Sequence, residues 1–413
     1  YGTYQGCSNL TGEPVCGDNV THMRSAYHYC NNLTGNPACG NNVVNMQYAY
    51  HNCHKLNGSP VCGDNVIDMS IAYENCLNLT GSPACGNNVL DMRNAYMGCI
   101  NLTGSPVCGN NVTIMRNTYY NCFNLTGSPV CGDNVTDMCS AYYYCNNLTG
   151  SPACGDNVID MTNTYQKCIN LNGSPVCGNN VTNMRMAYAY CNNLTGSPAC
   201  GENVTDMVSA YLECTNLTGS PVCGNNVVRF SSAYSNCRNL TGNAIIGPNV
   251  GNYTDYAYQN CNNLHGIEIY RTDCNATICL DEPVGEFTNI FVYADYFNES
   301  VINYATGYNR DKIYFHRDRN HQLTPLDKPF ADHDFKNWDW VNKGDFPWVD
   351  KDGFKTPEGV AFRSNVVEGD NILAEAPANC TLPICGPNVT NMASAYMDNW
   401  YLSGSPVCGD NVT

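Results

Sequence analysis

The chain repeats itself every 23 residues, and its cysteines mark the period. One series keeps this spacing without a slip, at Cys7, Cys30, Cys53, Cys76, Cys99, Cys122, Cys145, Cys168, Cys191, Cys214 and Cys237. A second series has the same period, at Cys16, Cys39, Cys62, Cys85, Cys108, Cys131, Cys154, Cys177, Cys200 and Cys223. A fixed period of this size predicts a solenoid, whose coils bury their apolar faces only against their neighbours. Because repeated coils make a long surface and not a single cleft, the pattern predicts no enzyme.

Each coil contains an apolar stripe with helical spacing. We number the first cysteine of a coil as position 0, and Cys145 starts a representative coil. Apolar side chains then stand at positions 13, 16, 20 and 23, which are Val158, Met161, Tyr165 and Cys168. Steps of three and four residues predict a short helix, of the α or 3₁₀ type. The asparagine at position 12 suits the cap of such a helix.

Positions 2 to 8 predict a short extended segment with the sequence N-L-T-G-S-P-V or N-L-T-G-S-P-A. Its leucine is expected to point inward, and its threonine and serine outward. Proline at position 7 lacks an N–H, so it should end a strand ladder or lie at its edge. We therefore expect an α/β repeat solenoid of the leucine-rich-repeat type, with one short strand and one short helix or 3₁₀ turn in each 23-residue coil.

The repeat resembles a known class of leucine-rich repeats. The run N-V-T-D-M-x-x-A-Y-x-x-C-x-N-L-T, seen at 134–148 and 203–217, is similar to the BspA-like class. The resemblance covers residues 1–265 and 385–413. Departures are the second cysteine at position 9, tyrosine where the family often has phenylalanine, and Gly-Ser-Pro inside the strand. The resemblance implies a secreted or cell-surface solenoid that binds or adheres, without catalysis.

Composition narrows the environment of the chain. Charged residues make up 13% of the sequence and the net charge is −17, so a nucleic-acid surface is not expected. No apolar run is long enough to predict a membrane span. The 28 cysteines fit an oxidising compartment. Because the chain starts at Tyr1 and not at methionine, we expect that a signal peptide has been removed. These features together predict an extracellular or cell-surface protein.

Sequons for N-linked glycans recur with the period, and no cofactor other than such glycans is expected. One interpretation is that the repeat consensus N-L-T and N-V-T creates sequons incidentally. The alternative, that many are used, is favoured by two coils that lose the position-2 sequon and gain N-G-S two residues later. The candidate sites are Asn9, Asn32, Asn57, Asn78, Asn101, Asn124, Asn147, Asn172, Asn193, Asn216, Asn239, Asn252, Asn275, Asn298 and Asn379.

The two cysteine series predict different chemistry. Positions 0 and 9 of one coil lie more than about 20 Å apart if the segment is extended, so a bond within a coil is not expected. Equivalent positions on adjacent coils lie about 5 Å apart, which permits a disulfide. At position 0 we favour reduced, buried thiols. At position 9 we favour consecutive pairs: Cys16–Cys39, Cys62–Cys85, Cys108–Cys131, Cys154–Cys177 and Cys200–Cys223.

Residues 266–384 break the repeat and predict an insert domain between the solenoid of 1–265 and a resumed coil at 385–413. Two matching pairs, Cys274 with Cys279 and Cys380 with Cys385, are expected to staple its ends. Acidic runs at 332–334 and 350–353 lack a full ligand set, so no metal site is predicted. An aromatic group is expected to form the domain core or a contact with a neighbouring subunit or a sugar: Trp338, Trp340, Trp348, Phe335 and Phe346.

The two ends of the sequence have complementary positions in the repeat. The chain stops at position 14 of one coil and starts at position 17 of another, which predicts either an excerpt of a longer solenoid or chains stacked head to tail. Head-to-tail contacts grow into open filaments. We therefore expect a non-enzymatic structural glycoprotein that polymerises with itself. The alternatives are an adhesin that binds a protein, a glycan or a cell surface and, more remotely, an ice-binding protein with Thr and Ser at positions 4 and 6.

Overall fold

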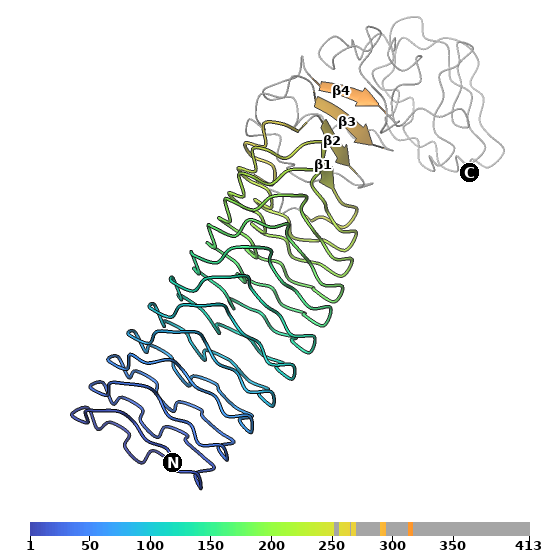
Figure 1. The fold of residues 1–413 in the computed structure, drawn as a ribbon. Helices are drawn as coiled ribbons and strands as arrows, with labels where there is room; N and C mark the ends of the chain where they lie inside the picture. Colours follow the sequence, from blue (N-terminus) through green and yellow to red (C-terminus); the bar gives the residue numbers. More distant parts are fainter. Residues whose placement is uncertain (252–255, 265, 270–289, 295–312, 317–413) are drawn as a thin grey trace, which may run out of the picture. The chain divides into compact units, whose positions relative to one another are not determined.

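The structure of the 413-residue chain is a computed structural model that describes residues 1–251, 256–264, 266–269, 290–294 and 313–316. These residues fall into two compact units. The first contains the 23-residue coils, and the second contains a small parallel sheet. In the first unit each coil lies directly on the preceding one (Figure 1).

The interior of the coil stack is a set of columns, one for each apolar position of the repeat. In the coil that starts at Cys145, the leucine, valine, methionine and tyrosine of positions 3, 13, 16 and 20 are fully buried. These residues are Leu148, Val158, Met161 and Tyr165. The predicted inward orientation of the leucine and of the apolar stripe is therefore confirmed. Burial of each side chain is worth about 1.5–3 kcal/mol relative to exposure.

The stripe does not lie on a helix, because the described residues contain none. Two residues of each coil adopt a left-handed backbone, at positions 18 and 22, as in Asn163 (φ 55°) and Lys167 (φ 65°). Right-handed and left-handed turns alternate, so successive peptide groups point in opposite directions along the stack. The consequence is a ladder of turns that buries the same side chains as the expected helix would.

This ladder of turns carries most of the hydrogen bonding between coils. The amides of positions 16, 18, 20 and 22 donate to carbonyls of the next coil, as in Met161 N to Asn183 O (2.9 Å) and Tyr165 N to Ala187 O (2.8 Å). The intervening amides donate three residues back, as in Thr164 N to Met161 O (3.1 Å). Every peptide group in this segment is thereby used.

Position 15 marks where the ladder of turns begins. Isolated parallel bridges join this position through successive coils, from His22 to Arg229. Its side chain is usually Asp or Asn, and it accepts the amide of position 17, as in Thr162 N to Asp160 Oδ1 (2.8 Å). Such side chains stabilise turns by replacing a backbone acceptor. The asparagine of position 12, expected to cap a helix, instead donates its Nδ2 to the preceding coil, as in Asn157 to Asp133 O (2.9 Å).

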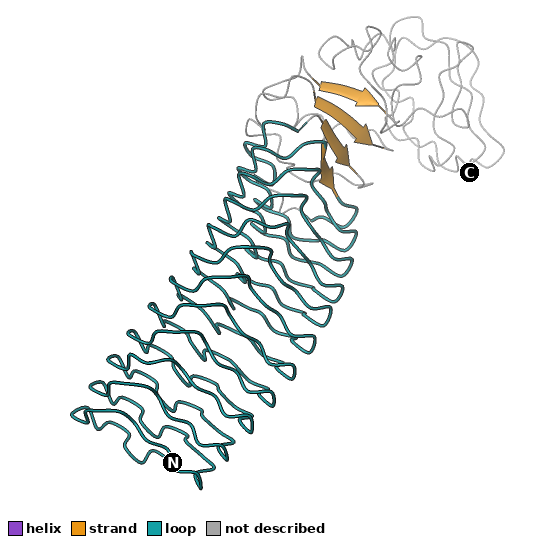
Figure 2. Ribbon diagram, viewed as in Figure 1, coloured by secondary structure: helices purple, strands orange, loops and turns teal. Residues whose placement is uncertain are grey.

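The segment predicted as a strand, positions 2 to 8, forms no strand in the described coils (Figure 2). Position 7 is proline and has no N–H to donate. At position 8 both backbone groups are bound by the tyrosine of position 20. Tyr142 donates its hydroxyl to Val130 O (2.7 Å) and accepts from Val130 N (3.1 Å). Two consecutive residues are therefore withdrawn from any ladder, and the assignment to the leucine-rich-repeat class stays a prediction.

The second unit contains a four-stranded parallel sheet of β1 (Asn243–Ile246), β2 (Gly266–Ile269), β3 (Ile290–Ala294) and β4 (Ile313–His316). The strands lie in chain order, β1-β2-β3-β4. Asn243 pairs with Gly266 and Ile290 with Ile313, so partners stand 266 − 243 = 23 and 313 − 290 = 23 residues apart. The sheet thus spans the predicted boundary between residues 265 and 266, and it shares the period of the coils.

Candidate functional site

A column of tyrosines at position 20 forms the centre of the coil stack. Neighbouring rings are stacked with centroids 5.3–5.6 Å apart, and Tyr142 and Tyr165 are within 4° of parallel. Burial raises the pKa of these phenols, so they remain neutral hydrogen-bonding groups. Sequence reasoning placed the tyrosine in the core but did not assign its hydroxyl. The signal was a polar group kept at a strictly apolar position of the repeat.

The position-0 cysteines are buried, as predicted. In the coil interior the thiol of each donates to the tyrosine carbonyl of an earlier coil, as in Cys145 Sγ to Tyr119 O (3.0 Å). Burial raises the pKa of the Cys145 thiol well above its ordinary value. This row therefore consists of protonated, hydrogen-bonded thiols packed as small apolar side chains.

The position-9 cysteines form a second row, which is half-buried. Each lies beside the glycine that starts position 10 of the next coil, as Cys16 Sγ does against Gly40 N (3.1 Å). No disulfide joins the cysteines in residues 1–251 and 256–264. The consecutive pairs expected from the sequence stay predictions.

The position-2 asparagines form a row of sequons along the stack. Most are exposed, and some hydrogen-bond to each other along the axis, as Asn147 Nδ2 does to Asn124 Oδ1 (3.5 Å). Asn32 and Asn101 are half-buried and donate Nδ2 to carbonyls of the preceding coil at 2.7 Å and 3.0 Å. A glycan replaces one hydrogen of this nitrogen, so these two sites are the least suited to modification. The other described members are Asn9, Asn78, Asn124, Asn147, Asn193, Asn216 and Asn239.

The two coils with N-G-S sequons present their asparagine differently. Asn57 and Asn172 are exposed, and each accepts the glycine amide of the preceding coil through Oδ1. The donors are Gly35 N at 2.8 Å and Gly150 N at 3.0 Å. Because the oxygen of the amide is the atom fixed against the protein, its nitrogen is left as the atom for a glycan. These are the best-formed glycosylation candidates in the described coils.

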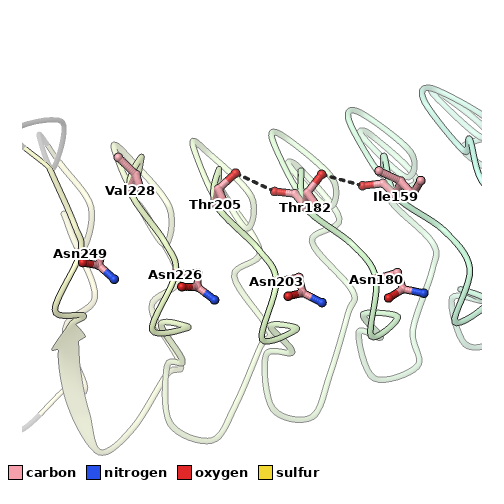
Figure 3. Close-up of a pocket in the computed structure, with 8 residues that line it drawn as sticks. All are labelled: Ile159, Asn180, Thr182, Asn203, Thr205, Asn226, Val228 and Asn249. Atoms are coloured by element: carbon pink, nitrogen blue, oxygen red, sulfur yellow. Dashed lines mark hydrogen bonds between the residues drawn. The ribbon is translucent and has the colours of Figure 1, made fainter.

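A shallow groove follows the stack between the asparagines of position 12 and the exposed residues of position 14 (Figure 3). One stretch has a volume of about 700 Å³ and is lined by Ile159, Asn180, Thr182, Asn203, Thr205, Asn226, Val228 and Asn249. A second stretch of about 550 Å³ lies in the first coils, lined by Asn19, Thr21, Asn42, Val44, Asn65, Ile67 and Asn88. No residue of either lining is charged. Sequence reasoning missed this groove, although the alternation of N-V-T with N-V-I and N-V-V was its signal.

The chemistry of the groove is uncharged and periodic. Asn203 and Asn226 donate Nδ2 to the preceding coil at 2.9 Å, so their Oδ1 atoms are the acceptors that remain. Thr182 and Thr205 donate their hydroxyls to carbonyls of the preceding coil at 3.3 Å and 3.1 Å. Ile159 and Val228 add exposed apolar surface. Such a surface suits a neutral ligand that offers hydroxyl donors and apolar faces.

Two histidines occupy position 21 of adjacent coils. The rings of His28 and His51 are stacked with centroids 4.7 Å apart. Both nitrogens of His28 and the Nδ1 of His51 are buried without a hydrogen-bond partner among the described residues. Burial, and then the neighbouring His28 and His54, lower the pKa of His51 to about 4. The pair is therefore neutral at physiological pH and resists protonation.

Several predicted residues lie outside the described part of the chain. They are Cys274, Cys279, Cys380 and Cys385, the glycosylation candidates Asn252, Asn275, Asn298 and Asn379, and the aromatic residues Phe335, Trp338, Trp340, Phe346 and Trp348. Within the described part, no group of three or more His, Cys, Asp or Glu residues could hold a metal ion. None of its segments is a helix long and apolar enough to cross a membrane.

We compared the chain with known proteins. No protein-family model matches it, and no curated protein is similar to it at a significant level.

Proposed function

We propose that the chain is a non-enzymatic extracellular structural glycoprotein, a solenoid subunit that stacks head to tail into a filament. The observation that carries the proposal is the directional hydrogen bonding of the coils. Each coil donates four amides of its ladder of turns to the next coil and offers carbonyls to the preceding one. Because every step repeats this pattern, a coil of another chain has the chemistry needed to continue it.

The side-chain columns support the same proposal. Tyrosine stacks on tyrosine at 5.3–5.6 Å through the whole series, and the buried cysteines repeat one hydrogen bond to a carbonyl. Stacking of like residues favours addition of like coils, since each coil contacts only its neighbours. Glycans at the exposed asparagines would keep such a filament soluble from the side.

Electron microscopy of the purified protein over a range of concentrations tests the proposal. We expect filaments that lengthen with concentration and whose axial spacing between coils matches that of the stack. Enzymatic removal of N-linked glycans is the matched control: it should change the lateral association of filaments and leave the axial spacing unchanged. Discrete single particles at every concentration, with and without glycans, would contradict polymerisation.

The groove favours a second candidate function, an adhesin that binds a neutral glycan. Its two rows of asparagine and threonine repeat at the coil spacing, and an extended polysaccharide also offers repeated hydroxyls and apolar faces. Binding to immobilised neutral polysaccharides would test this function. The double variant Thr182→Lys/Thr205→Lys should abolish binding, whereas Thr195→Lys/Thr218→Lys, exposed at position 4 of neighbouring coils, should not. Equal loss or equal retention in the two variants would contradict a groove site.

A further inference from the structure

The position-9 cysteines are not equivalent along the stack, although their spacing is. A glycine amide of the next coil donates to the cysteine sulfur at only four of the nine described steps. The donors and acceptors are Gly40 to Cys16 (3.1 Å), Gly86 to Cys62 (3.1 Å), Gly155 to Cys131 (3.3 Å) and Gly201 to Cys177 (3.1 Å). At these steps the sulfur is held directly against the peptide that follows the next cysteine.

The residue at position 8 distinguishes these four steps. In each of them a coil with valine at this position is followed by a coil with alanine, as in Val130 and then Ala153. The other five steps run from alanine to valine or, once, from Val107 to Val130. The correspondence is complete over the ten coils. Position 8 therefore determines which side of the row a cysteine faces.

A difference in backbone position explains this effect. The amide of position 8 lies 2.9–3.0 Å from the tyrosine hydroxyl in alanine coils and 3.1–3.2 Å in valine coils. The smaller side chain lets the segment approach the core. In three alanine coils the cysteine sulfur then contacts the methionine of its own coil, as Cys154 does Met161 at 3.5 Å. Valine-coil cysteines instead point at the next coil.

We propose that the position-9 cysteines form disulfides within these valine–alanine doublets: Cys16–Cys39, Cys62–Cys85, Cys131–Cys154 and Cys177–Cys200. Cys108 is left out, because its coil is followed by a second valine coil. The assignment shares its first two bonds with strictly consecutive pairing and differs from it in the register of all later ones. The step from Val107 to Val130 is where the register shifts.

The geometry permits the bonds. Stacked rings place adjacent coils 5.3–5.6 Å apart, within the Cα separation of about 4.4–6.8 Å that disulfides adopt. Two thiols become one disulfide and lose two protons and two electrons. An external disulfide, such as oxidised glutathione, takes them and becomes two thiols. Burial raises the pKa of Cys62 to about 12 and that of Cys85 to about 11, so oxidation is expected while the coils close and not afterwards.

Cyanogen bromide mapping tests the pairing directly. A methionine stands at position 16 of the first nine coils, so cleavage in acid separates every position-9 cysteine from the next without disulfide exchange. The full chain is oxidatively folded with glutathione, alkylated and cleaved, and linked fragments are identified by mass spectrometry. We expect the four doublets and an alkylated Cys108. A Cys108–Cys131 or Cys154–Cys177 link, a mixture of registers, or complete alkylation would overturn the proposal.

Three variants keep the test specific. Cys131→Ser should make only Cys154 newly alkylated, whereas the matched control Cys108→Ser should leave all four links intact. Val130→Ala creates a valine-to-alanine step after Cys108 and should produce a new Cys108–Cys131 link. If Val130→Ala leaves the original register unchanged, position 8 does not set the pairing and the proposal is wrong.

Discussion

The coils and the sheet use the same 23-residue period with different backbone hydrogen bonds. Counted from Cys237, β1 (Asn243–Ile246) occupies positions 6 to 9, where the preceding coils carry Ser-Pro-Val-Cys or Ser-Pro-Ala-Cys. β1 has Ala244 where those coils have proline, and it pairs in parallel with β2. In the coils the tyrosine hydroxyl binds position 8, and the ladder of turns joins the layers instead. The period sets the spacing, and local chemistry decides which segment carries the bonds.

The largest effect is expected from removing one tyrosine hydroxyl in the coils. Tyr142→Phe leaves the amide and carbonyl of Val130 without their partner, which should lower the free energy of unfolding by about 2–5 kcal/mol. Urea unfolding followed by circular dichroism measures the change. Tyr29→Phe, at an exposed tyrosine, is the control and should have an effect near zero. Equal effects of the two variants would contradict the role of the hydroxyl.

A proline placed in the sheet should be nearly as costly there as it is harmless in the coils. β2 has a partner on each side, so Glu268→Pro removes an amide from the ladder and should destabilise the sheet by about 3 kcal/mol. Amide hydrogen exchange in β1 and β3 reports the loss, while exchange in the coils before residue 242 should not change. Glu268→Thr is the control. Unchanged protection of β1 and β3 in the proline variant would show that this ladder does not hold the sheet.

A smaller, pH-dependent effect is expected from the stacked histidines. Because the pKa of His51 falls from 6.5 to about 4 on folding, the unfolded chain binds more protons than the folded one between these values. The free energy of unfolding should be constant above pH 6.5 and fall by about 1–3 kcal/mol as the pH drops to 4. His51→Gln, which copies Gln166 at the same position, should flatten the profile. His22→Gln, at an exposed histidine, should leave the slope unchanged, and an equal loss of slope in both variants would refute the assignment.

The smallest effect is expected where the comparison is sharpest. Pro129→Ala restores an N–H at position 7 of one coil but leaves the Val130 groups bound to Tyr142. We expect a loss of about 1 kcal/mol, from greater freedom of the unfolded chain and a smaller buried side chain, and no new strand. Amide exchange of residues 127–131 checks this. New protection there would mean that proline alone prevents the strand.

The sequence predicted which side chains are buried better than it predicted the backbone. Leu148, Val158, Met161 and Tyr165 all lie in the core, because burial depends on spacing, and a ladder of turns places these positions inward as a helix would. The left-handed residues could not be foreseen, since position 18 carries Ile71 and Met186, types that rarely adopt a positive φ. Those conformations depend on hydrogen bonds to neighbouring coils, which a single repeat does not reveal.

The candidate site was predictable in part for the same reason. The rows of sequons and cysteines follow from the period alone. The Oδ1 contacts that orient Asn57 and Asn172, and the groove beside position 12, depend on how one coil contacts the next. Sequence reasoning therefore identified which residues recur, and the structure shows which atoms of each remain available.

Residue-level amide hydrogen exchange across the coil that starts at Cys145 tests the central claim most directly. The account predicts slow exchange at Met161, Asn163, Tyr165 and Lys167, whose amides bind the next coil, and at Ala153, whose amide binds a tyrosine hydroxyl. It predicts faster exchange at Gly150 to Ser151, on the exposed side. Slow exchange through residues 147–151, with rapid exchange at 161–167, would show that a strand and not the ladder of turns joins the coils.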